Sequence, residues 1–127
     1  MTQAKLLSAA LGVEITDLDL RQPLSADQQA ELRRLLDEYQ VMVFRNQQIS
    51  VEDQIRVLGI FGKVSDETAD GSRHTFVSNV LPNGLFGDLA LIFHSDFAFV
   101  DYQPPVISLY GIDVGEAAGP TSFANCT

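Results

Sequence analysis

The stretch LALIFHSDFAF, residues 89–99, joins an apolar run to a histidine and an aspartate two positions apart. Side chains at positions i and i+2 of a strand point to the same face of a sheet. We therefore expect His94 and Asp96 to converge while Ser95 faces away. An imidazole and a carboxylate on one face can bind a common metal ion, so the pair is the candidate metal site.

The flanks of this pair support the metal interpretation. Apolar residues 91–93 precede it, and Phe97 and Phe99 follow, so we expect apolar side chains to exclude water from the bound ion. A second imidazole would complete the two-histidine, one-carboxylate set of non-haem iron(II) sites, which leaves open coordination positions. Taken alone, a histidine followed two residues later by an aspartate is a weak signal, because a solvated pair on a surface strand also fits it.

Upstream of residues 89–99, the pattern predicts alternating strands and helices. Residues 11–15 form a weak strand candidate, and Ser25 with Gln28 predicts a capping box at the start of a helix. That helix places four apolar side chains on one stripe and four charged side chains on the other face. The stripe comprises Leu32, Leu35, Leu36 and Tyr39, and the charged face comprises Arg33, Arg34, Asp37 and Glu38.

Residues 41–44 are continuously apolar and predict a strand buried on both faces. A second helix is expected to begin at Ser50 and to end at Gly62. Its inner stripe is predicted from three apolar positions, which are Val51, Ile55 and Leu58.

The second half of the chain predicts strands and loops without further helices. A polar loop at 64–73 precedes a strand at 75–80, and the sequence Pro-Asn-Gly at 82–84 signals a turn. Further strand candidates lie at 89–93 and 106–112. This order predicts an α+β fold in which a sheet or barrel is built toward the C-terminus.

Composition excludes several classes of partner and site. The chain has 127 residues, with 8 Lys plus Arg against 17 Asp plus Glu, a formal net charge of −9. Such an acidic chain repels nucleic acid and anionic membranes. The apolar runs are shorter than the roughly 18 residues of a membrane span. Cys126 is the only cysteine, which excludes an internal disulfide and suits a reducing, cytoplasmic location; we expect it to be buried as a small apolar residue.

Several motifs occurring in order give the chain a family resemblance. They are LDEY at 36–39, VMVFRNQ at 41–47, FGKV at 61–64, FHSDFAF at 93–99, PP at 104–105, SLY at 108–110 and AGPTSFAN at 118–125. Together they resemble the TauD/TfdA family of iron(II)- and 2-oxoglutarate-dependent dioxygenases. The match extends from about Leu11 to the last residue, and the ordered set is far more specific than any single piece.

The resemblance implies a fold, a reaction and site residues. The fold would be a partial double-stranded β-helix, or jelly roll, with flanking N-terminal helices, and residues 1–127 would form one incomplete domain. The reaction would be hydroxylation of a small organic substrate, with 2-oxoglutarate converted to succinate and CO2. His94 and Asp96 would be the first two iron(II) ligands, and Thr121 would help to hold the distal carboxylate of 2-oxoglutarate. The third ligand, a histidine, and a carboxylate-binding arginine would follow Thr127.

The chain departs from the family pattern at some positions. Ala118 and Pro120 replace commoner residues beside Thr121, which weakens that assignment. His74 precedes the motif and does not match the distal ligand, so we expect a surface or packing imidazole. The loop Ser65-Asp66-Glu67 is acidic where taurine-type members carry a histidine, which argues mildly against a sulfonate substrate.

Three hypotheses therefore stand. The first is a dioxygenase present as an N-terminal fragment that is inactive by itself. The second is a non-catalytic, truncated remnant that binds a metal weakly or pairs with another chain through an open sheet edge. The third is an unrelated α+β binding domain. Self-association is compatible with each of them.

Overall fold

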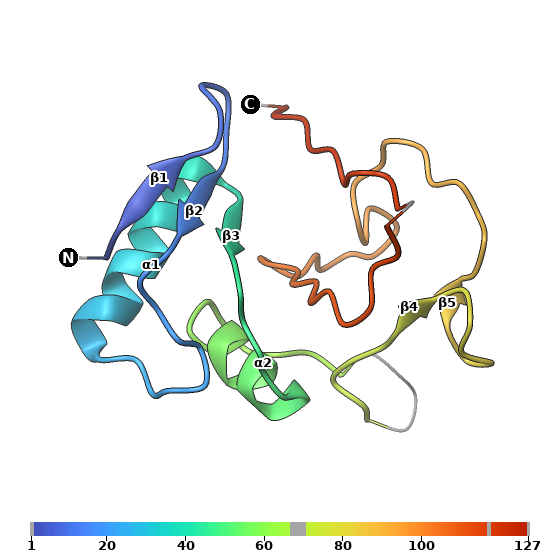
Figure 1. Cartoon of the computed structure of the whole chain (residues 1–127), viewed down its shortest axis with the longest axis horizontal. Coiled ribbons are helices and arrows are strands. Elements are labelled where there is room, and N and C mark those ends of the chain that lie inside the picture. The colour runs from blue at the N-terminus through green and yellow to red at the C-terminus, as the bar shows by residue number, and fades with distance from the viewer. Residues whose placement is uncertain (1, 67–70, 117, 127) are drawn as a thin grey trace.

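In a computed structural model, the chain is described for residues 2–66, 71–116 and 118–126. A three-stranded sheet with two helices occupies one side of the molecule, and long irregular segments with a small two-stranded sheet occupy the other (Figure 1). The elements, in chain order, are β1 Ala4–Leu6, β2 Val13–Ile15, α1 Ala26–Tyr39, β3 Met42–Phe44, α2 Val51–Leu58, β4 Val77–Ser78 and β5 Leu85–Phe86. The expected α+β class is confirmed at this level, whereas the jelly roll stays a prediction.

The larger sheet combines one antiparallel and one parallel pairing. β1 pairs antiparallel with β2, with Ala4 opposite Ile15, and β2 pairs parallel with β3, with Val13 opposite Met42. The sequence did not predict β1. Its turn is closed by the backbone bond from Leu7 N–H to Gly12 O at 2.9 Å, and Gly12 adopts φ +93°, a conformation that favours glycine.

Helix α1 connects the two parallel strands and begins as the sequence predicts. Ser25 accepts a hydrogen bond from the Gln28 backbone N–H, while the Gln28 side chain accepts from the Ser25 N–H, which completes a capping box. Gln40 ends the helix in the left-handed conformation, with φ 64°. Its backbone N–H donates to Leu36 O, so this donor is paired where the chain turns from the helix into β3.

The core lies between the central strand and the helices, and all its fully buried members fall within residues 13–60. They are Val13, Ile15, Leu18, Leu20, Leu32, Leu35, Val57 and Ile60. The predicted inner stripe of α1 is confirmed, because Leu32 and Leu35 are buried and Leu36 and Tyr39 are half-buried. The predicted charged face of α1 is exposed.

Two predictions about β3 and α2 need correction. β3 is half-buried and not buried on both faces, because Met42 and Phe44 pack against the core whereas Val43 lines an open surface hollow. α2 ends at Leu58 with Gly59 as its cap, so Gly62 is not its stop. The buried residue of α2 is Val57, whereas the predicted stripe at 51, 55 and 58 is only half-buried.

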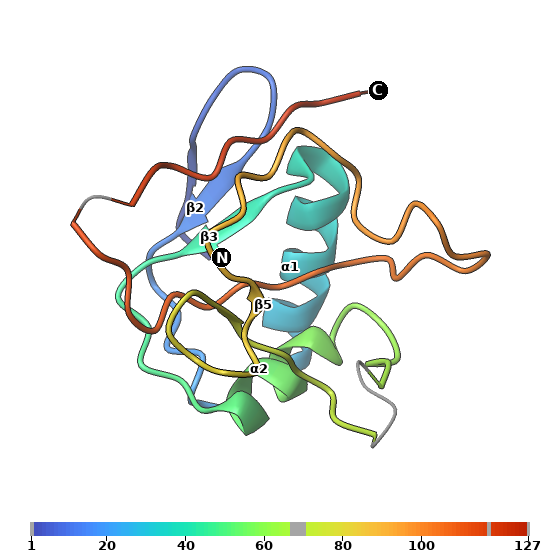
Figure 2. The same cartoon turned by 90° about the vertical axis from the view of Figure 1, so that its right-hand side faces the viewer.

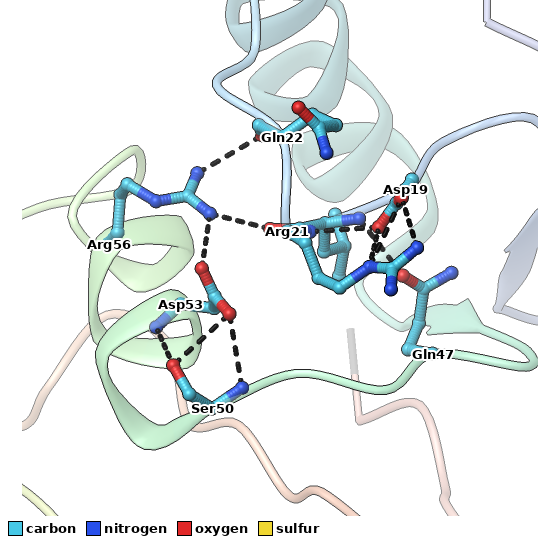
Figure 3. Close-up of polar contacts among 8 residues, drawn as sticks. Asp19, Arg21, Gln22, Gln47, Ser50, Asp53 and Arg56 are labelled. Carbon is cyan, nitrogen blue, oxygen red and sulfur yellow. Dashed lines mark hydrogen bonds and ion pairs between the residues drawn. The ribbon is translucent and has the colours of Figure 1, made fainter.

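Polar contacts attach the loop between β2 and α1 to α2 (Figure 3). Arg56 of α2 donates to the backbone carbonyls of Leu20 at 2.7 Å and Gln22 at 3.2 Å, and to the Asp53 carboxylate at 2.8 Å. Asp53 also completes the capping box of α2 with Ser50, and the Arg56 bond is the main reason that the pKa of Asp53 lies below its ordinary value. One guanidinium thus fixes the position of α2 against the loop.

The side chain of Gln47 makes a second attachment to the same loop. Its Oε1 accepts from the Leu20 N–H at 3.0 Å, and its Nε2 donates to Leu18 O at 3.0 Å. Next to it, the hydrogen bonds from the Arg21 guanidinium and backbone to Asp19 hold the pKa of Asp19 at about 2. The loop is therefore ordered by polar contacts while Leu18 and Leu20 enter the core.

After Ile60, no residue of the described chain is fully buried. The predicted strand at 75–80 is reduced to Val77–Ser78, although the turn at 82–84 is present, closed by Gly84 N–H to Leu81 O at 3.0 Å. The candidates at 89–93 and 106–112 are not strands. A strand needs a hydrogen-bonded neighbour, and the described segments provide none there. The polar loop predicted at 64–73 lies partly outside the described residues, because 67–70 are not among them.

The second half is tied to the first by a few polar contacts. Gln54 donates to the Ser108 hydroxyl at 2.9 Å, Tyr110 donates to Gln47 O at 3.2 Å, and Asn125 donates to Ala10 O at 3.2 Å. The last described residues consequently run beside the β1–β2 hairpin, as both views of the chain show (Figures 1 and 2). Within the described residues, no helix has the length and apolar character needed to cross a membrane.

The core assignment predicts the effect of truncating Leu32, whose side chain is 0% exposed. Leu32→Ala should lower the free energy of unfolding by about 2–5 kcal/mol, because it removes buried methyl groups and leaves a cavity. Urea unfolding monitored by circular dichroism measures this loss. Leu109→Ala is the matched control, since Leu109 is 73% exposed. An equal loss in both variants would contradict the assignment.

Candidate metal site

His94 and Asp96 lie in an irregular segment and not on a strand. The chain passes from an extended stretch into a turn at 96–99, in which Phe97 adopts φ 54° and its carbonyl accepts from Val100 N–H at 3.2 Å. The expected mechanism of convergence, strand alternation, is therefore wrong. The expected convergence is nevertheless observed, because His94 Nε2 and Asp96 Oδ1 lie within hydrogen-bonding distance of each other.

The imidazole of His94 and the carboxylate of Asp96 meet through specific atoms. His94 Nε2 lies 3.0 Å from Asp96 Oδ1, and His94 Nδ1 lies 2.7 Å from the backbone carbonyl of Ile92. A carbonyl oxygen only accepts hydrogen bonds, so Nδ1 must carry a proton. A neutral imidazole has one such proton, which leaves Nε2 with its lone pair directed at a carboxylate.

This arrangement requires a positive charge between Nε2 and Oδ1. Two lone pairs facing each other at 3.0 Å repel, so the contact is favourable only when a second proton or a metal cation lies between the atoms. The Ile92 carbonyl first, and then Asp96, raise the pKa of His94 above the ordinary 6.5.

The geometry of the pair also fits a metal ion. Ligand atoms at about 2.1 Å from an octahedral metal are about 3 Å apart when they occupy adjacent positions. The observed Nε2–Oδ1 separation of 3.0 Å matches that spacing. The Ile92 carbonyl fixes the ring in the tautomer that offers Nε2 to a metal, as backbone partners of metal-bound histidines commonly do. Among the described residues, no group of three or more His, Cys, Asp or Glu gathers to complete a metal site.

The surroundings of the pair are exposed to solvent, whereas apolar side chains that exclude water were expected. The side chains of His94 and Asp96 are 47% and 54% exposed. The apolar neighbours Ile92, Phe93 and Phe99 are exposed as well. The ring of Phe99 packs against that of the half-buried Phe97, with centroids 6.2 Å apart. The reason is that the core ends at Ile60, so no packed layer lies against this segment within the described chain.

Thr121, the predicted carboxylate ligand, lies elsewhere. It lines an open surface hollow of about 390 Å³ between β3, the β1–β2 turn and the C-terminal segment. Neither His94 nor Asp96 is among the described residues that line this hollow. The structure therefore brings the two predicted metal ligands together but does not join Thr121 to them.

The remaining residues that the sequence analysis weighed, His74, Cys126 and the acidic loop, lie apart from the His94–Asp96 pair. His74 packs edge-on against Phe76, with ring centroids 5.4 Å apart, as expected of a packing imidazole. Cys126 is exposed, so the prediction of a buried cysteine is wrong; the C-terminal segment lies on the surface of the sheet and not in the core. Asp66 of the acidic loop lies 3.8 Å from Arg73, while Glu67 is outside the described residues.

One candidate residue had not been assigned a role. Arg45 follows β3 and lines the same hollow as Thr121. The sequence contained it within the motif VMVFRNQ at 41–47, but a strand motif by itself gives no sign that its arginine lies beside a hollow.

Comparison with known proteins places the chain in a family. The family model of the taurine catabolism dioxygenase TauD, TfdA family matches residues 3–127. An alkylsulfatase of Acinetobacter baylyi is 30% identical over 128 residues, covering 97% of this chain and 39% of that protein. An alpha-ketoglutarate-dependent 2,4-dichlorophenoxyacetate dioxygenase of Cupriavidus pinatubonensis is 31% identical over 138 residues, covering 91% and 46%. The chain thus spans less than half the length of these curated relatives.

Solved structures share part of this fold. The crystal structure of AAD-2 in complex with Mn(II) and N-oxalylglycine is 29% identical, with a TM-score of 0.50, over 52% of this chain and 26% of that one. A Burkholderia xenovorans protein assigned as an alpha-ketoglutarate dependent 2,4-D dioxygenase is 23% identical, with a TM-score of 0.51, over 55% and 27%, and supports the fold alone. Because the family model covers nearly the whole sequence, the chain belongs to the TauD/TfdA family of dioxygenases.

Proposed function

We propose that His94 and Asp96 are two ligands of the iron(II) ion of a 2-oxoglutarate-dependent dioxygenase that acts on a small organic molecule. The observation that supports this most is the 3.0 Å separation of Nε2 and Oδ1 in a chain of this family. Membership supports the reaction class, and the AAD-2 complex supports a divalent metal beside an oxalyl compound, which shares with 2-oxoglutarate a carbonyl next to a carboxylate.

The chain's own residues would prepare the site in a defined way. The Ile92 carbonyl holds the His94 ring so that Nε2 faces Asp96, and Asp96 supplies the negative charge that favours a cation there. Bound iron(II) would supply the redox chemistry that couples decarboxylation of 2-oxoglutarate to hydroxylation of the substrate. This proposal includes two further expectations. A jelly roll would enclose the site, and the apolar residues that are exposed near it would be covered.

A non-catalytic role is the second candidate, and one observation favours it. Several apolar side chains between 89 and 114 are exposed, a surface suited to pairing with another chain. In that case the chain binds metal weakly and forms no product. Succinate formation from 2-oxoglutarate in the presence of iron(II) would exclude this alternative, and it would also overturn the expectation that the fragment is inactive by itself.

Metal binding tests the proposed ligands directly. Titration with Mn(II), followed by electron paramagnetic resonance of the free ion, should show one site on the wild-type chain. His94→Ala and Asp96→Ala should each weaken binding about tenfold or more, because each removes a ligand. His74→Ala is the control and should bind as the wild type does, since His74 packs against the ring of Phe76 and is not a proposed ligand. Equal weakening by the control, or unchanged binding in both ligand variants, would refute the site.

The charge argument predicts the titration of His94 without metal. NMR titration of the wild-type imidazole should give a pKa above 6.5, and Asp96→Asn should lower it, because the neutral amide no longer stabilises the imidazolium. Asp101→Asn, which removes a charge further along the same loop, should leave it unchanged. With a raised folded-state pKa, the stability from this pair is present below the unfolded-state pKa and is lost as pH rises through the folded-state pKa. An unchanged pKa in Asp96→Asn would contradict the pairing.

A further inference from the structure

We infer that residues 88–116 form a docking surface for a basic, amphipathic polypeptide segment. Two properties of this segment, named here the acidic apolar surface, define such a partner: its exposed apolar side chains and its charge. The partner is independent of the proposed iron site, and its chemistry is what the second candidate function leaves open.

Large apolar side chains are exposed along the whole acidic apolar surface. Ile92 is 84% exposed, Phe99 87% and Leu109 73%. The other large apolar side chains exposed here are Leu89, Leu91, Phe93, Tyr102, Ile107, Ile112 and Val114. The segment lies on the side of the molecule away from α1, so the core at 13–60 does not cover it (Figure 1). Exposed apolar side chains gathered in one region are typical of a surface that binds a partner.

Charge is distributed unequally along the chain. All 8 lysines and arginines lie within residues 1–73, and no Lys or Arg follows Arg73 in the sequence. The acidic apolar surface therefore carries carboxylates without lysine or arginine. Its carboxylates belong to Asp88, Asp96, Asp101, Asp113 and Glu116, all of them exposed.

The cations of the first half do not neutralise this surface. Arg21 pairs with Asp19 at 2.7 Å, and Arg56 pairs with Asp53 at 2.8 Å, each within three positions of its own place in the sequence. Among the described residues, no ion pair joins a Lys or Arg to a carboxylate of 88–116. Cations that complement these carboxylates must therefore come from a partner.

The combination of exposed apolar side chains and unpaired negative charge selects the class of partner. A second copy of the chain is disfavoured, because both halves of the sequence are acidic and two copies repel each other. Nucleic acid and anionic membranes are repelled for the same reason. A polypeptide segment with Lys or Arg beside apolar residues suits both properties, since it buries its apolar side chains and places its cations near the carboxylates. An amphipathic helix is a common form of such a segment.

A peptide-binding experiment tests the inference on the full chain. The probe is a fluorescein-labelled amphipathic peptide of about 14 residues built from leucine and lysine, and binding is followed by fluorescence anisotropy. The wild-type chain should bind this peptide, and added salt should weaken the binding. A leucine–glutamate peptide should not bind, because its charge is repelled. A lysine–serine peptide should bind about tenfold more weakly or worse, because it has no apolar face to bury.

Charge variants show whether binding depends on the acidic apolar surface or on net charge alone. The double variant Asp101→Asn with Asp113→Asn should weaken binding of the leucine–lysine peptide about threefold to tenfold. The matched control is Asp17→Asn with Asp37→Asn, which removes the same charge from exposed positions of the first half. This control should bind nearly as the wild type does.

Apolar variants test the second property of the surface. Phe99→Ser should weaken binding about threefold or more, because its exposed ring is available to a partner. Val80→Ser is the matched control, since Val80 is 83% exposed but lies outside residues 88–116. It should leave the affinity unchanged. Neither side chain is buried in the core, so circular dichroism of both variants should match that of the wild type.

The outcomes separate this inference from the proposed iron site. Absence of leucine–lysine peptide binding, equal binding of the lysine–serine peptide, or equal weakening by the two pairs of charge variants would overturn the inference. A dimer in sedimentation that excludes the peptide would assign the surface to a second copy and would overturn it as well. Peptide binding that depends on Asp101 and Asp113 supports it even if Mn(II) fails to bind. Mn(II) binding without peptide binding would refute the inference and leave the metal site standing.

Discussion

Burial of Val13 and Ile15 of β2 against Leu32 and Leu35 of α1 is the packing on which the rest of the structure depends. These four side chains are at most 2% exposed, and β2 is the only strand of the larger sheet with a neighbour on each side. Helix α1 is the connection that makes β2 and β3 parallel, so its packing on β2 also sets the position of β3. The loop with Leu18 and Leu20, and then α2 through Val57, complete the same core.

The sequence predicted those elements whose signals are local. The capping box at Ser25, the helix start at Ser50 and the apolar stripe of α1 depend on residues a few positions apart, and all three are present. β1 was missed because its pairing with β2 is set by a turn of weak sequence pattern. The strands expected at 89–93 and 106–112 depend on distant partners, and an apolar run without a hydrogen-bonded neighbour has no reason to remain a strand.

The candidate functional residues show the same difference between local signals, which the sequence reveals, and distant contacts, which it does not. The spacing of His94 and Asp96 predicted that they meet, which is the case, although they lie in an irregular segment and not on a strand. The contact of His94 with the Ile92 carbonyl, which orients the ring, is a backbone contact that spacing cannot reveal. Arg45 and Thr121 lie far apart in the sequence, and only the folded arrangement places them beside one surface hollow.

The molecule thus has a packed scaffold at 13–60 and, beyond it, a loosely held segment that carries the proposed metal ligands. Hydrogen exchange by mass spectrometry, with and without Mn(II), tests this division most directly. Amides within 13–60 should exchange slowly in both states, and the peptide containing 92–97 should exchange fast without metal and more slowly with it. Equal protection along 75–112 without metal, or slowing by Mn(II) in some other segment, would contradict the account.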